Sequence, residues 1–130
     1  MLRKEITYTD YNGVERKEVF YFNLTKTELM KEYGTGDGTV ETLQKIIDAK
    51  DGRALMDNFD KLIRSAYGEK SPDGKYFNKS KEISDAFACT PAYDSLFCEL
   101  LENDKAAAEF VNLVLPAELV AEAKLTTSTQ

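Results

Sequence analysis

Residues 2–22 decide the fold, and they read LRKEITYTDYNGVERKEVFYF. Along residues 2–9, apolar and polar side chains mostly alternate, which is the period of a β-strand that buries one face. Asn12-Gly13 follows this run. Both residues tolerate a positive φ, so the pair is the strongest short signal for a hairpin turn. The sequence therefore predicts a β-hairpin over residues 1–23.

The second strand of this hairpin is expected over residues 14–22, which end in large apolar and aromatic side chains. A two-residue loop would place Ile6 opposite Val19. The second strand does not alternate cleanly, so its pattern alone does not settle the register. A lone hairpin is only marginally stable in water. We therefore expect its aromatic side to pack on the helices or on another chain.

Helix signals fill most of the remaining chain. Thr25 and Glu28 have the spacing of a capping box at a helix N-terminus. Thr90 before Pro91 is a second clear start, because proline at the first helical position loses no hydrogen bond. Apolar residues then recur at helical spacing. The predicted helices cover residues 25–33, 39–49, 52–67, 81–87, 91–102 and 104–115, and a last short helix starts at Pro116.

Two glycine-containing stretches predict loops between these helices. Residues 34–38 read GTGDG and predict a flexible loop. Residues 68–79 read as a polar loop that begins at a glycine suited to end the preceding helix. Within it, residues 71–74 have the proline and glycine of a β-turn. We expect Tyr76 and Phe77 to anchor this loop to the core.

The length of 130 residues and the mass of 14.7 kDa fit one domain. A chain of this length buries a core without needing a disulfide or a metal. We predict a single α+β domain over residues 1–130 that is mainly α-helical. It comprises the hairpin over residues 1–23, a helical body of about five to six short helices over residues 24–124, and a flexible tail over residues 125–130.

The net charge of −6 comes from 23 acidic and 17 basic side chains, and it lies entirely in the C-terminal part. Residues 80–130 hold nine acidic and three basic side chains, whereas residues 1–79 hold equal numbers of each. This balance argues against nucleic acid as a partner, because phosphate contacts need a basic surface. The acidic part either keeps the protein soluble or matches a basic protein surface.

No constellation of residues for catalysis stands out. The sequence contains no histidine, which is the most common general base near neutral pH and the most common metal ligand. Cys89 and Cys98 lack the further Cys or His residues of a zinc site, and we expect both to be buried structural residues. The sequence therefore predicts no enzyme activity, no cofactor and no metal site.

The chain also lacks membrane and export signals. No apolar run approaches the ~18 residues that a membrane-spanning helix needs. Residues 1–20 contain no apolar region of the kind found in signal peptides. We therefore expect a cytosolic protein with reduced thiols and no membrane partner.

Aromatic residues suggest where a partner would bind, since the chain has seven tyrosines and seven phenylalanines. Aromatic side chains often anchor protein interfaces, although most of these lie on stripes predicted to face the core. The candidate contact residues are the aromatic Phe20, Phe22, Tyr93 and Phe97, together with the acidic Glu99, Glu102 and Glu109.

Three stretches of this chain resemble small phage proteins of the tail assembly chaperone family. The first two are residues 22–29 (FNLTKTEL) and residues 65–75 (SAYGEKSPDGK). The third is residues 92–97 (AYDSLF), which continues through residues 106–112 to Pro116. The N-terminal hairpin is less expected in this mostly helical family.

The resemblance implies a protein that binds the long tape measure protein, and often the tail tube subunit, while a phage tail is built. Such proteins act in the cytoplasm of the bacterial host and are absent from the finished particle. They are mostly helical, and a homo-oligomer is possible. Many are made in two lengths, of which this chain would be the shorter. The family offers no catalytic residues to carry over.

Two other functions fit the same residues. A structural protein of the virion would remain in the tail or at the head–tail joint, and its presence in purified particles would distinguish it. An inhibitor or regulator of a host protein would also use an acidic surface, and a pull-down from host extract would reveal it. An enzyme is a weaker alternative, because no acid–base or nucleophile constellation supports it.

Overall fold

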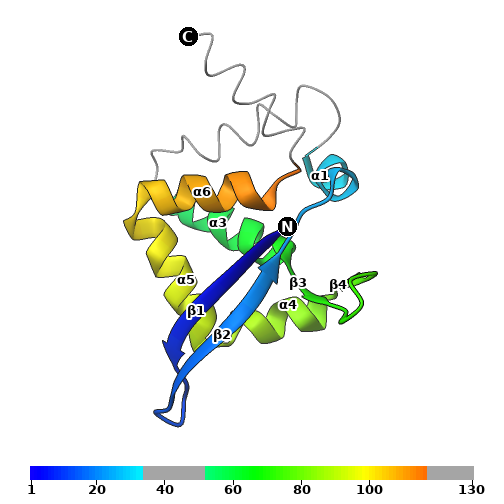
Figure 1. Ribbon diagram of the computed structural model, residues 1–130. Coiled ribbons are helices and arrows are strands. Elements are labelled where there is room, and N and C mark those ends of the chain that lie inside the picture. The colour runs from blue at the N-terminus through cyan, green and yellow to red at the C-terminus, as the bar shows by residue number, and fades with distance from the viewer. Residues whose placement is uncertain (34–51, 117–130) are drawn as a thin grey trace.

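The computed structural model describes residues 1–33 and 52–116, and these form a mixed α+β fold (Figure 1). A four-stranded antiparallel sheet has the strand order β1-β2-β3-β4. Five helices accompany it in the described ranges. The elements are β1 (Leu2–Thr9), β2 (Glu15–Phe22), α1 (Lys26–Tyr33), α3 (Gly52–Ala66), β3 (Tyr67–Lys70), β4 (Phe77–Asn78), α4 (Lys81–Ala88), α5 (Pro91–Glu102) and α6 (Asp104–Val114).

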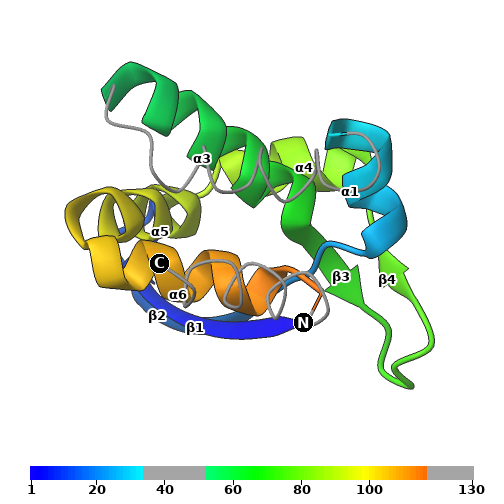
Figure 2. The same ribbon diagram turned by 90° about the horizontal axis from the view of Figure 1, so that it is seen from above.

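The β1–β2 ribbon lies on one side of the molecule, with α6 beside it and α3 on the far side (Figure 2). The expected loop at residues 34–38, the expected helix over residues 39–49, the helix from Pro116 onward and the tail at residues 125–130 fall wholly or almost wholly outside the described residues. Within the described ranges, the helices start and end within one or two residues of their predicted bounds.

The register of the β1–β2 hairpin differs from the prediction by one residue. Ile6 lies opposite Glu18, not opposite Val19. The reason is a three-residue loop in place of the expected two-residue one. Asp10 donates its backbone N–H to the carbonyl of Val14 and accepts from the N–H of Gly13, whose φ is +81°. This is a type I turn followed by a glycine in the left-handed region, which adds one residue to the loop.

The predicted polar loop over residues 68–79 is wrong in part, because it contains β3 and β4. The chain passes from α3 directly into β3, so Gly68 is a buried strand residue and not a helix cap. The β-turn over residues 71–74 is confirmed: Gly74 donates to the carbonyl of Ser71. Tyr76 does not anchor this segment, since it is 65% exposed.

The capping signals are confirmed where the structure describes them. Thr25 Oγ1 accepts from the N–H of Glu28 at 3.1 Å, and the Glu28 carboxylate accepts from the N–H of Thr25 at 2.9 Å. Ser80 and Thr90 accept from the N–H groups of the residues three positions later. Asn103 caps α6 in the same way. These bonds satisfy N–H groups that a helix start otherwise leaves open.

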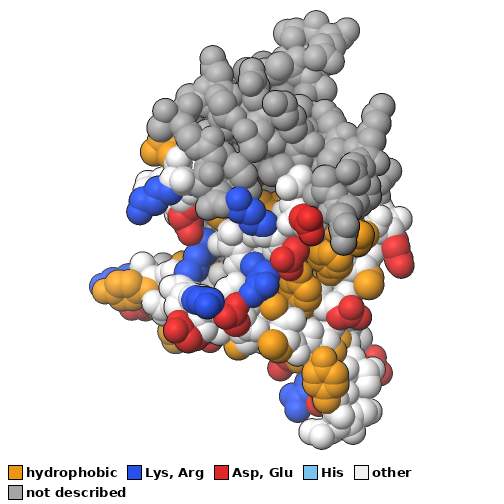
Figure 3. Space-filling model, turned by 180° about the vertical axis from the view of Figure 1, so that it is seen from behind, with side chains coloured by type: hydrophobic (Ala, Val, Ile, Leu, Met, Phe, Trp, Pro, Cys, Tyr) orange, Lys and Arg blue, Asp and Glu red, His pale blue; other side chains and the backbone are white. Residues whose placement is uncertain are grey.

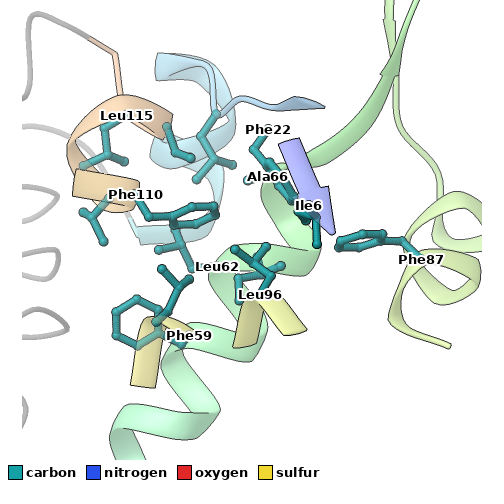
Figure 4. Close-up of a cluster of buried hydrophobic side chains, with 14 of the residues drawn as sticks. Ile6, Phe22, Phe59, Leu62, Ala66, Phe87, Leu96, Phe110 and Leu115 are labelled. Atoms are coloured by element: carbon teal, nitrogen blue, oxygen red, sulfur yellow. The ribbon is translucent and has the colours of Figure 1, made fainter. Parts of the chain in front are cut away.

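The core lies between the sheet and the helices (Figure 4). Hydrophobic burial there provides most of the driving force for folding. The buried core residues are Ile6, Phe22, Leu24, Leu29, Phe59, Leu62, Ile63, Ala66, Phe87, Ala92, Leu96, Leu100, Phe110, Val111, Val114 and Leu115. The even-numbered side of the hairpin therefore packs in the same core as the helices.

Lys79 joins three parts of the chain just after β4. Its ammonium donates to the carbonyls of Asn23 at 2.6 Å and Ser65 at 2.9 Å. It also donates to the Glu28 carboxylate at 2.7 Å. The ends of β2 and α3 and the start of α1 are thus held by one partly buried cation.

Candidate protein-binding surface

Three of the four aromatic candidates from the sequence contact Phe87, and the fourth, Phe97, contacts Tyr93. The ring centroid of Phe87 lies 5.4 Å from that of Phe20, 5.7 Å from that of Phe22 and 5.8 Å from that of Tyr93. Tyr93 in turn stacks on Phe97 at 5.7 Å. These tilted, edge-on and offset arrangements are the favourable ones for aromatic pairs. We call Phe20, Phe87, Tyr93 and Phe97 the aromatic row.

The aromatic row is partly open to solvent. Phe20, Tyr93 and Phe97 are half-buried, whereas Phe87 is buried beneath them. Phe22 is fully buried, so it supports the row from inside and does not reach the surface. Sequence reasoning did not single out Phe87. Its spacing of four residues from Ile83 on the apolar side of α4 was the available signal.

A polar cluster ties the row to α3 and α4. The Tyr93 hydroxyl donates to the Asp60 carboxylate, and the Arg64 guanidinium donates to Asp85. Arg64 also lies 4.0 Å from Asp60. Burial raises the pKa of Tyr93, and the hydrogen bond to Asp60 raises it further. Tyr93 therefore stays protonated at neutral pH and remains a donor that links α5 to α3.

The three acidic candidates do not gather at the aromatic row. Glu99 pairs with Lys4 of β1 at 3.0 Å, and Glu99 follows Phe97 by two residues, so the two point to different sides of α5. Glu102 is exposed near the end of α5, and Glu109 is exposed on α6. Two other acidic residues adjoin the row: Asp60 binds Tyr93, and Asp94 is next to Tyr93 in the chain.

The space-filling view shows the face of the molecule that lies behind the view of Figure 1 (Figure 3). Hydrophobic side chains form an area there, and acidic side chains lie around it. Such a pattern, apolar at the centre with a polar edge, is typical of protein–protein interfaces. The described residues therefore form a candidate contact surface, with half-buried rings and acidic side chains close to them.

The expectation of buried cysteines is wrong, since Cys89 and Cys98 are both exposed. Cys89 caps the C-terminal end of α4, and Cys98 lies on the outer side of α5. The described residues contain no group of three acidic, Cys or His residues that could hold a metal ion. Among the described helices, none is long and apolar enough to cross a membrane.

The sequence matches the phage tail assembly chaperone family over residues 1–130, which is the whole chain. The chain belongs to this family. No curated protein and no solved structure matches it. Membership assigns this tail assembly chaperone a role in building phage tails.

Proposed function

We propose that this tail assembly chaperone is a non-catalytic protein that binds the phage tape measure protein in the host cytoplasm and keeps it soluble. The tail tube subunit is a second candidate partner. The observation that carries the proposal is the aromatic row, a partly open line of large rings on a small acidic domain. Family membership supplies the context of tail assembly.

The physical reason lies in the partner. A long helical protein whose apolar stripes are not yet covered associates with other copies of itself. A domain that covers part of such a stripe with its own apolar surface prevents this association. Half-buried rings suit the task, because aromatic side chains bury large areas on contact. Several copies of a 14.7 kDa domain are needed for one long rod.

The proposal is tested by expressing the tape measure protein of the same phage with and without this chaperone. We expect the tape measure protein to move from the insoluble to the soluble fraction and to copurify with several chaperone copies. Phe97→Asp should abolish this rescue, while circular dichroism still reports a folded domain. Tyr76→Asp is the matched control, since Tyr76 is an exposed ring on the β3–β4 turn, away from the aromatic row.

Equal soluble yield with and without the chaperone would contradict the proposal. Detection of this chain in purified mature particles would then favour a structural role in the virion. A chaperone that leaves after assembly is absent from such particles.

A further inference from the structure

We infer that the surface where α3 meets α5 binds one basic amphipathic helix of the partner, along the half-buried line of Tyr93, Phe97 and Leu101. This inference rests on the proposed function and deepens it, because it states the chemistry of the segment that docks.

The apolar line follows from helical spacing. Tyr93, Phe97 and Leu101 are four residues apart on α5, so they lie along one side of the helix, and all three are half-buried. On α3, Met56 is 43% exposed and stands one turn before Asp60, the residue that binds Tyr93. The bond between Tyr93 and Asp60 thus joins the apolar line on α5 to the side of α3 that carries Met56. The line on α5 spans roughly 12 Å, which matches about two turns of a partner helix.

The charge on α5 is one-sided. Its twelve residues include Asp94, Glu99 and Glu102 and neither lysine nor arginine. Within the described ranges, Asp94 and Glu102 form no ion pair. Glu102 also lies in the last turn, where the helix dipole disfavours a negative charge. This unbalanced charge is explained if a cation on a partner meets it.

Arg64, which lies beside Asp60, is already engaged. Arg64 binds Asp85 and lies within 4.0 Å of Asp60, so it is not free to neutralise Asp94. A partner helix with lysine or arginine beside its apolar stripe would supply the missing positive charge. A partner helix with acidic residues there would be repelled, because like charges facing each other across an interface disfavour binding.

The surface is preorganised for this contact. The Tyr93 hydroxyl is held by Asp60, and the Tyr93 ring packs on Phe87 and Phe97. Side chains that are already fixed lose little conformational entropy on binding. Recognition by apolar anchors at positions i, i+3 or i+4 and i+7 of a helix is an established mode of binding to such a surface.

Two synthetic peptides of about 18 residues test the inference with the full chain. Both carry leucine at the same helical positions. One has lysine and the other glutamate at the remaining positions. Binding is followed by fluorescence anisotropy at moderate salt. We expect the lysine peptide to bind about tenfold or more tightly than the glutamate peptide. Phe97→Ala should also lower the affinity for the lysine peptide by about tenfold.

A charge control separates docking from general attraction to an acidic protein. Asp94→Lys reverses one exposed acid beside the line, and Glu15→Lys reverses one exposed acid on the hairpin. The lysine peptide should lose affinity in the first variant by about tenfold and change little in the second. Equal effects of the two variants, or equal binding of both peptides, would overturn the inference.

A second copy of the chain is the competing occupant. Sedimentation of the chain alone would then show a dimer that Phe97→Ala dissociates, without binding of either peptide, and this result would also overturn the inference. The proposed function is judged separately. Rescue of the tape measure protein without discrimination between the peptides rejects the docking chemistry alone. Failure of the wild-type chain to rescue the tape measure protein rejects the chaperone function itself.

Discussion

The ring of Phe77 lies directly against Gly68, across the β3–β4 pair. A Cβ atom on residue 68 would stand 2.6 Å from Cε2 of Phe77 and 3.0 Å from the carbonyl oxygen of Asn78. The first contact is closer than carbon atoms tolerate, and the second involves backbone. The absence of a side chain at Gly68 therefore allows β4 to pair with β3 at this point.

Gly68→Ala should accordingly destabilise the protein by about 1–3 kcal/mol, the usual cost of inserting a methyl group into a packed site. Urea unfolding followed by circular dichroism measures the loss. In a Phe77→Ala background the same substitution should cost less, because the ring no longer opposes the new methyl group. An equal cost in both backgrounds would show that the ring is not the obstacle.

Lys79→Met should lower the free energy of unfolding by about 1–3 kcal/mol, since it leaves the carbonyls of Asn23 and Ser65 without their donor. Methionine keeps a similar length and the apolar stem, so the loss reports on the ammonium. Thermal and urea unfolding measure it. Lys75→Met, a lysine on the exposed β3–β4 turn, is the matched control and should change stability by less than about 0.5 kcal/mol.

The bond between Lys79 and Glu28 also predicts a pH dependence. Burial alone would raise the pKa of Glu28, but the hydrogen bonds from Lys79 and from the Thr25 backbone lower it below its ordinary value of 4.5. The folded state therefore binds this proton less readily than the unfolded state. The stabilisation is present above pH 4.5 and is lost as the pH falls through the lower folded pKa.

The measurement is the difference in free energy of unfolding between the wild type and Lys79→Met, taken from pH 7 down to pH 3. We expect the difference to shrink as the pH falls below about 4.5. The pKa values of Asp10 and Asp73 are lowered too, by hydrogen bonds within their own turns. Those groups are the same in both proteins, so their effect cancels. A difference that stays constant with pH would contradict a role for Glu28.

Local signals were predicted best from the sequence. The capping box of Thr25 and Glu28 and the start at Thr90 depend on residues within one helical turn, so a single sequence shows them. The sheet was predicted only in part. Whether a strand at Tyr67 pairs with Phe22 depends on contacts between residues far apart in the chain, which local spacing does not report.

The candidate contact surface was also predicted only in part, because it combines local signals with contacts between distant segments. Sequence reasoning selected Phe20, Tyr93 and Phe97 because they are aromatic, and the structure brings them into one row. It did not find Phe87, which joins them, because that link exists only once α4 packs against β2 and α5. The sequence predicted two buried cysteines, because free cysteine is usually buried. Both are exposed instead, one at the end of α4 and the other on the outer side of α5.

The exposed thiols lead to a prediction about modification. Cys89 and Cys98 should both react with a thiol reagent such as Ellman's reagent in the folded protein, without denaturant. Replacing either one by serine should change the free energy of unfolding by less than about 0.5 kcal/mol, because no packed core is altered. Partner binding should also persist. Detection of only one reactive thiol, or stoichiometric zinc in the purified protein, would contradict this account.

The last prediction concerns the acidic part of the chain. Because residues 80–130 hold the whole net charge of −6, association with a basic partner should slow as salt rises and screens the charges. Reversing Glu99, Glu102 and Glu109 together should slow it further. This triple variant also replaces the pair between Lys4 and Glu99 by two like charges, so part of its effect would come from a disturbed hairpin.

Glu102→Lys alone is therefore the sharper test, since Glu102 is exposed and forms no ion pair among the described residues. We expect it to reduce the association rate by about threefold at low salt, with little change in the dissociation rate, as is usual for a charge at the edge of an interface. Stopped-flow or surface-based kinetics with the copurified partner measure both rates. The effect should vanish at high salt. An association rate that changes neither with salt nor with this substitution would show that the acidic surface serves solubility and not recognition.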